Sequence, residues 1–191
     1  HVEGTTDPLR DIDIINMELV MADIEMAERR VDKAQKAAKG DKKFLHEAEV
    51  FTELLAHLNE GKLARTFDCS DEDMAIIATS DLLTLKKTIY VANLAEAEVN
   101  EPEANRHYQA VKALADSEGS QVIPICAKLE ADIAELDDPE EKAMFMEELG
   151  VAESGLDKLI RSSYSLLGLI SFLTAGADEC RAWTIKRGTK A

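Results

Sequence analysis

The sequence has few cysteines, no long hydrophobic run and no excess of basic residues, and each shortage excludes a class of protein. Its three cysteines, Cys69, Cys126 and Cys180, lie far apart without a C-x-x-C pair, which argues against a zinc site and a disulfide framework and favours a reducing cytoplasm. The longest apolar stretch, 166–173, is much shorter than the roughly 18 residues of a membrane span, so no membrane association is expected. A net charge of −16 repels phosphate over most of the surface, so we expect no DNA binding, and any RNA contact must be local.

The composition is that of a helix-rich globular protein. Apolar residues make up 46% of the chain, charged residues 31% and aromatic residues 5%. A chain of 191 residues can form one substantial core, or a medium domain with a smaller one attached. It starts at His1 without an initiator methionine, so we expect a piece of a longer protein.

The first part of the chain predicts a pair of long antiparallel helices. A helical period runs from Asp11 to about 38, Gly40 is expected to supply a left-handed turn that ends this helix, and a second helix follows from Phe44 to 58. The box Ser70-x-x-Asp73 then predicts a further helix toward residue 85. Two apolar seams mark the first helix: Ile12, Ile15, Leu19, Ala22 and Met26 in one, and Val20, Ile24, Ala27, Val31, Ala34 and Ala38 in the other.

The second part alternates predicted strands and helices. Continuous apolar runs at 88–92 and 121–126 predict two strands covered on both faces, separated by a helix at 102–117. This order implies a parallel sheet. Further helices are expected after residue 128, from 137–139, and from 154 to about 168. The last residues, 168–191, predict two short strands that either join this sheet or begin a small β domain, with Tyr90 and Trp183 as core residues.

Polar loops follow both predicted parallel strands, and such loops meet at one edge of the sheet, where ligands bind. Residues 93–96 follow the first strand and 126–128 the second. The amide of Asn93 offers a donor and an acceptor, which suit the edge of a purine. The alternative is a turn in which Asn93 caps backbone groups and Glu96 is solvated.

Four long segments carry a family resemblance: "HVEGTTDPLRDIDIINMELVMADIE", "TLKKTIYVANLAE", "IPICAKLEADIAELDDPEEKAMFMEELG" and "SFLTAGADECRAWTIKRGTKA". Together they resemble, in order and over essentially the whole chain, the Obg-like ATPases of the YchF type. The resemblance implies an α/β fold, namely part of a parallel-sheet P-loop NTPase with an inserted antiparallel helical coiled-coil hairpin. Residues 1–8 and 87–167 would belong to the nucleotide-binding domain, 9–86 to the helical insertion, and 168–191 to the opening strands of a TGS β domain.

The same resemblance assigns a base-binding site and an ATP preference. Asn93 would contact the purine, the backbone of Leu94 its edge, and Glu96 would mark the altered specificity, because related GTPases have Asn-Lys-x-Asp there. The loop that closes over the base would be Cys126, Ala127 and Lys128. The phosphate-binding loop and Mg²⁺ ligands of the family have no counterpart in this sequence, so we expect no catalytic or metal-binding residues in this chain, although the intact protein would be a cytoplasmic ATPase.

A basic segment lies at the predicted tip of the helical hairpin. Seven basic side chains stand against two acidic ones between 29 and 43, a net charge of +5. The resemblance favours contact with RNA or the ribosome through this tip; the alternative is a solvated helix face. The seven residues are Arg29, Arg30, Lys33, Lys36, Lys39, Lys42 and Lys43.

Two other functions stay open. The chain could be a docking module for RNA or protein that needs no nucleotide, or part of a GTPase of the same fold, which Glu96 disfavours. The acidic run at 130–148 could suggest a metal site, but "DDPEE" is also a typical helix start, and we prefer that interpretation.

Overall fold

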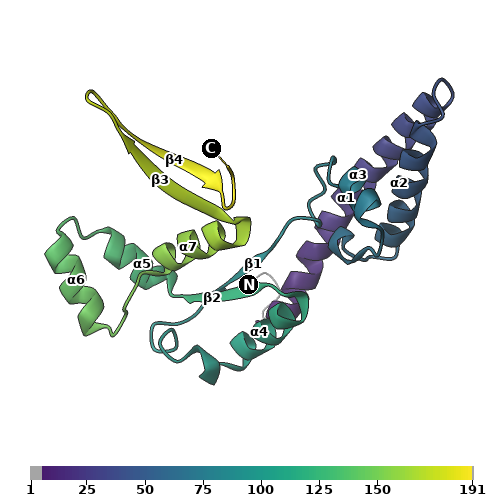
Figure 1. Ribbon diagram of the computed structural model, residues 1–191. Coiled ribbons are helices and arrows are strands. Elements are labelled where there is room, and N and C mark those ends of the chain that lie inside the picture. Colours follow the sequence, from purple (N-terminus) through teal and green to yellow (C-terminus); the bar gives the residue numbers. More distant parts are fainter. Residues whose placement is uncertain (1–5, 191) are drawn as a thin grey trace. The chain divides into compact units, whose positions relative to one another are not determined.

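The computed structural model describes residues 6–190, which form two compact units, 1–87 and 88–191 (Figure 1). The described residues form helices, one parallel and one antiparallel sheet, which confirms the predicted α/β class. Most of the predicted segment 1–8 lies outside the described residues, and the finer division into four parts stays a prediction. No helix in the described part is both long and apolar enough to cross a lipid bilayer.

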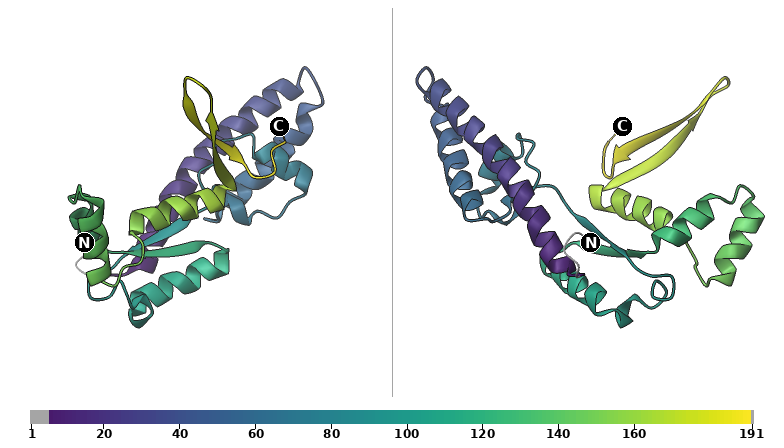
Figure 2. Two further views of the ribbon diagram at one scale, coloured as in Figure 1. Left: turned by 60° about the vertical axis from the view of Figure 1, so that its left-hand side comes forward. Right: turned by 180° about the vertical axis from the view of Figure 1, so that it is seen from behind.

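The first unit is built on two long helices. Helix α1 (Pro8–Ala38) begins at Asp7, whose side chain accepts a hydrogen bond from the Arg10 N–H at 3.2 Å. Helix α2 (Phe44–Asn59) follows a short turn and lies beside α1 in all three views (Figures 1 and 2). The unit also contains a 3₁₀ turn, η1 (Ala64–Thr66), and the short helix α3 (Asp71–Ile77).

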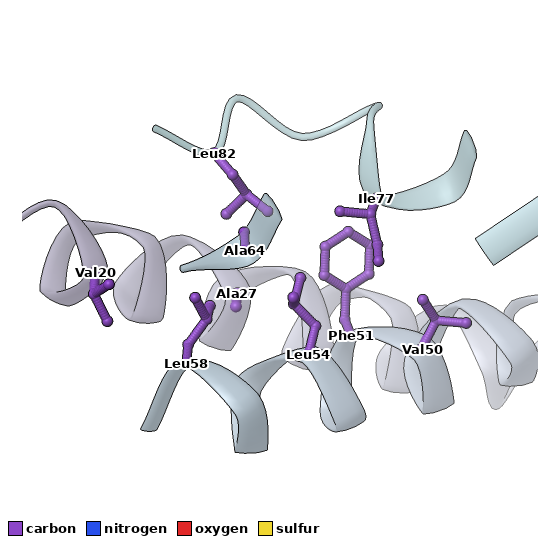
Figure 3. Close-up of a cluster of buried hydrophobic side chains, with 9 residues drawn as sticks. All are labelled: Val20, Ala27, Val50, Phe51, Leu54, Leu58, Ala64, Ile77 and Leu82. Carbon is purple, nitrogen blue, oxygen red and sulfur yellow. The ribbon is translucent and has the colours of Figure 1, made fainter. Parts of the chain in front are cut away.

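One hydrophobic core holds the first unit together (Figure 3). The second seam predicted for α1 is confirmed by the burial of Val20, Ala27 and Ala34. The first seam is confirmed at Met26, which packs against this core, but is wrong at Ile15 and Ala22, which are exposed. The core consists of Val20 and Ala27 from α1, Val50, Phe51, Leu54 and Leu58 from α2, and Ala64, Ile77 and Leu82.

Helix α3 begins as predicted but ends early. The Ser70 hydroxyl accepts a hydrogen bond from the Asp73 N–H at 3.1 Å, which confirms the predicted cap. The helix stops at Ile77 and does not continue toward residue 85. Farther along the chain, the buried carboxylate of Asp23 accepts the N–H groups of Leu83 at 2.6 Å and Thr84 at 2.8 Å, so the predicted helix could not include these two residues.

The second unit contains the predicted parallel pair of strands, β1 (Ile89–Asn93) and β2 (Gln121–Ile125). The expected full cover on both faces is wrong for β1, where the Val91 side chain stays exposed, whereas β2 contacts both α4 and α7. Between the strands lie a 3₁₀ turn, η2 (Pro102–Ala104), and α4 (Arg106–Glu118). Asn105 separates the two because its side chain accepts the first free N–H groups of α4.

Three helices follow β2: α5 (Ala127–Ala134), α6 (Pro139–Glu148) and α7 (Gly155–Leu167). The Asp138 side chain accepts the Glu140 N–H at 2.8 Å, which confirms that the acidic segment starts a helix. The last strands, β3 (Leu169–Ala175) and β4 (Cys180–Lys186), form an antiparallel sheet separate from β1 and β2. The prediction for Trp183 is wrong: its side chain is 45% exposed.

Candidate functional site: two loops at the carboxyl edge of the parallel sheet

The register of the parallel strands brings the two predicted base loops together. Asn93 pairs with Ile125 as the last residues of β1 and β2, so both chains leave the sheet at the same edge. The Leu94 N–H then donates to the Ile125 carbonyl at 2.8 Å and extends the ladder by one bond. The first loop is thereby fixed to the end of the neighbouring strand, and the Leu94 N–H is no longer available to a ligand.

Asn93 connects one loop to the other. Its Oδ1 accepts the N–H of Ala127 at 3.0 Å, across 34 positions of sequence. Ala127 is the first residue of α5, and the residue at the cap position, Cys126, makes no side-chain capping bond. Asn93 therefore caps backbone groups, as in the alternative interpretation of this loop. The backbone group that it caps is at the start of α5, the helix that follows the other strand. Because Oδ1 faces this N–H, the Nδ2 group of the exposed amide points away from it. No described residue accepts a hydrogen bond from Nδ2, so both of its N–H donors are available to a ligand.

A second link lies at the rim of the same loops. Lys128 Nζ lies 3.3 Å from Glu96 Oε2, and both side chains are exposed. The hydrogen bond to Glu96 and its negative charge raise the pKa of Lys128 above its ordinary value. Glu96 is thus paired with a lysine of the opposite loop rather than solvated alone.

The remaining residues of the second loop differ in exposure. Ala127 and Lys128 are exposed and can cover a ligand, whereas the Cys126 side chain is only 4% exposed. The three cysteines are free thiols. The structure therefore brings Asn93, Leu94 and Glu96 together with Ala127 and Lys128, and turns the Cys126 thiol into the interior.

Glu130 was not singled out from the sequence. Its carboxylate accepts the N–H groups of Gly155 at 2.6 Å and Leu156 at 3.2 Å, and so joins α5 to the start of α7. No sequence pattern predicts a contact between Glu130 and Gly155, which are 25 positions apart. The one sequence feature that indicates a close contact at the start of α7 is the glycine at position 155, directly after the Ser154 cap.

The basic tip of the α1–α2 hairpin is exposed, with one exception. The Arg30 side chain is 22% exposed, lies 5.0 Å above the Phe51 ring and 3.5 Å from Glu47, and donates to the Thr79 hydroxyl. These contacts hold the first unit together, so Arg30 is not part of the exposed basic surface. That surface consists of Arg29, Lys33, Lys36, Lys39, Lys42 and Lys43.

Local acids neutralise part of this surface. Arg29 lies 3.8 Å from Glu25, Lys36 lies 3.7 Å from Asp32, and Lys43 lies 2.9 Å from Asp41. Within residues 6–190, Lys33, Lys39 and Lys42 have no acidic partner within salt-bridge distance. These three lysines are the strongest candidates for contact with an external anion.

Among residues 6–190, no three His, Cys, Asp or Glu side chains are grouped so that they could hold a metal ion. We therefore assign no step that involves Mg²⁺ to this chain.

Comparisons with known proteins give a consistent picture, although no family model matches the sequence. The "Ribosome-binding ATPase YchF" of Bacillus subtilis (strain 168) is 46% identical over 192 residues, which cover 100% of this chain and 52% of that protein. The protein of the same name from Escherichia coli O157:H7 is 46% identical over 194 residues, again 100% of this chain and 52% of its own length. The whole chain is thus similar to about half of each protein named YchF.

The fold agrees with that similarity. The solved structure of the Schizosaccharomyces pombe YchF GTPase has a TM-score of 0.82 at 32% identity, and the match covers 100% of this chain and 52% of that one. The chain thus spans about half the length of the YchF proteins that it matches. Their names disagree on the nucleotide, ATPase in the bacterial proteins and GTPase in the yeast one, so they leave the base preference open.

Proposed function

We propose that this chain is part of a longer YchF protein that binds and hydrolyses ATP and associates with the ribosome. The chain would supply the base-recognising loops and the helical arm, by which we mean the first unit with its α1–α2 hairpin. The observation that carries the proposal is the hydrogen bond from the Ala127 N–H to Asn93 Oδ1. It joins two loops at the sheet edge where ligands bind in this type of fold. It also leaves the Asn93 donors unused, and the N7 atom of a purine is an acceptor.

The same bonds favour adenine over guanine. Because the Leu94 N–H is bonded to Ile125, the backbone group of Leu94 that remains for a base is its carbonyl. A carbonyl accepts from the 6-amino group of adenine but repels the O6 of guanine. Lys128 lies 3.3 Å from Glu96 Oε2 and competes there with the N1–H and 2-amino groups of guanine, which need both oxygens of a carboxylate.

Within this proposal the chain positions the base and does not cut the phosphate. Hydrolysis would be a phosphoryl transfer to water, in which positioning and charge neutralisation supply most of the catalysis. A phosphate cradle and Mg²⁺ would have to come from the other half of the longer protein. The ligand contacts assigned to this chain are those of Asn93, Leu94, Glu96, Ala127 and Lys128, with Cys126 holding its loop from the interior.

Titration of the longer protein with labelled ATP and GTP tests the proposal. We expect tighter binding of ATP, and a loss of about tenfold or more in Asn93→Ala, which removes one base contact and one loop contact. Asp138→Ala is the control, because it removes a side-chain helix cap at α6, outside both loops. Tighter binding of GTP would support a GTPase, and equal affinities of wild type and Asn93→Ala would support a docking module without nucleotide.

We also propose that the tip of the α1–α2 hairpin contacts ribosomal RNA. Lys33, Lys39 and Lys42 support this, because they are exposed and free of acidic partners among the described residues. Each phosphate contact contributes about one unit to the slope of log affinity against log salt. Changing the three lysines to glutamate should therefore weaken ribosome binding and flatten its salt dependence.

The control for the tip changes Lys142, Lys158 and Lys186 to glutamate, an equal change of charge in the second unit. If both triple variants lose ribosome binding equally, the effect is one of net charge and the tip has no special role.

A further inference from the structure

A carboxylate outside the base site connects one of its loops to the next helix. Glu130 lies one turn into α5, the helix whose first residues are Ala127 and Lys128. Its Oε1 accepts the N–H of Gly155 at 2.6 Å and its Oε2 accepts the N–H of Leu156 at 3.2 Å. These are the first two residues of α7, whose N–H groups have no partner inside the helix. One side chain of α5 therefore satisfies two backbone donors of α7.

The contact between α7 and the base loop is too close for any side chain at position 155. A Cβ atom on Gly155 would lie 2.6 Å from Ile125 Cγ2 and 2.9 Å from Glu130 Oε1. Ile125 is the last residue of β2, directly before the loop at 126–128. The start of α7 thus rests both on the strand that precedes this loop and on the helix that follows it.

The other end of α7 leads straight into the C-terminal hairpin. Helix α7 closes at Gly168, which has a positive φ of 64°, and β3 begins at the next residue. The Gly168 carbonyl accepts the N–H of Arg187, just after β4, at 2.7 Å. Helix α7 therefore contacts β2 and runs directly into the β3–β4 hairpin.

We propose that Glu130 is a positioning residue that holds α5 in register with α7 and thereby couples occupancy of the base site to α7. The proposal depends on the proposed function, because it needs a base between the loops. When Ala127 and Lys128 contact a bound base, the first turn of α5 is held in place. Because Glu130 lies in that turn and is hydrogen-bonded to the N–H groups of Gly155 and Leu156, the start of α7 is then held in place as well. Because such coupling is reciprocal, restraint of α7 must also favour base binding.

The test is Glu130→Gln in the longer protein. A glutamine has one acceptor oxygen, and its NH₂ group would face the second backbone N–H, so the two-point contact is lost. We expect about tenfold weaker binding of ATP and unchanged binding of inorganic tripolyphosphate, which has no base. Glu135→Gln is the matched control: Glu135 is exposed, lies just past the end of α5, and should change neither affinity.

Hydrogen exchange measured by NMR reports the coupling itself. In wild type, ATP should slow exchange of the Gly155 and Leu156 amides, and in Glu130→Gln this dependence on ATP should disappear. Equal ATP affinity of Glu130→Gln and wild type overturns the inference. A parallel loss of ATP and tripolyphosphate binding also overturns it, because that result indicates general loosening of the fold.

The outcomes separate this inference from the proposed function. If wild type does not bind ATP, the proposed function fails; if wild type binds ATP and the variant binds it equally well, only the role of Glu130 fails. If Glu130→Gln does not fold, Glu130→Asp replaces it, because aspartate keeps the charge but is one methylene too short to reach both N–H groups. The same results are expected for its affinities for ATP and tripolyphosphate, and the same results would overturn the inference.

Discussion

Replacement of Asp23 by alanine should destabilise the helical arm more than any exposed charge change. The Asp23 side chain is 1% exposed and accepts three hydrogen bonds, from the Leu83 N–H at 2.6 Å, the Thr84 N–H at 2.8 Å and the Thr84 hydroxyl at 2.6 Å. The same hydroxyl accepts the Ala64 N–H at 2.8 Å, so one carboxylate fixes two segments onto α1.

The expected loss follows from the donors that the substitution leaves behind. A buried donor without an acceptor costs about 1–3 kcal/mol, and Asp23→Ala leaves two N–H groups and one hydroxyl in that condition. Even at the low end of this range, the first unit should lose about 3 kcal/mol of stability. Since about 1.4 kcal/mol corresponds to tenfold, amides protected by the first unit should exchange roughly 100-fold faster.

Hydrogen exchange with mass spectrometry is the suitable assay, because residues 1–87 contain no tryptophan or tyrosine and fluorescence would report the second unit only. Peptides from α1 and α2 should lose protection, while peptides from α4 serve as the internal reference. Asp13→Ala, an exposed change on the same helix, should leave exchange unaltered. Wild-type protection of α2 in Asp23→Ala would refute the reasoning.

Three further predictions concern stability and titration. Gly155→Ala should lower the stability of the second unit by about 1–3 kcal/mol in thermal unfolding, because its Cβ would overlap Ile125, whereas Gly40→Ala, with its nearest atom at 3.7 Å, should not. The Ser70 hydroxyl bond holds the pKa of Asp73 below 3.8, so Asp73 stabilises α3 at neutral pH and loses this effect as the pH falls through its lowered pKa; Ser70→Ala should raise that pKa in an NMR titration. Arg30→Lys should destabilise the first unit by about 1 kcal/mol in urea unfolding, because lysine cannot keep the contacts to Phe51, Glu47 and Thr79 together, and an unchanged midpoint would contradict this.

Local signals in the sequence predict much of this fold. The helix caps at Ser70, Asp138 and Ser154 can be predicted from the sequence, because each side chain accepts a backbone N–H that is at most three residues away. The parallel pairing follows from two apolar runs with a helix between them. What the sequence could not show is which long-range partner a polar side chain finds, and Asp23, which accepts the Leu83 N–H from 60 positions away, is the clearest example.

The candidate site shows the same limit. Its loops could be placed from strand order, but that the Asn93 acceptor is bonded to Ala127 emerged only once the strands were in register. Arg30 has the same charge as its neighbours in the basic run, and only packing against Phe51 distinguishes it from them. Trp183 was expected in a core because of its size, yet β3 and β4 form a two-stranded sheet in which it remains exposed.

The central claim is that Asn93 reads a purine as well as joining the two loops, and Asn93→Asp separates these roles. A carboxylate still accepts the Ala127 N–H but has no donor for the N7 atom of a base. The most direct measurement is therefore the ATP affinity of Asn93→Asp beside that of wild type and Asn93→Ala. We predict that Asn93→Asp loses about tenfold or more, close to Asn93→Ala, while retaining the wild-type melting temperature. Wild-type affinity in Asn93→Asp would show that Asn93 is a helix cap alone and would contradict the account.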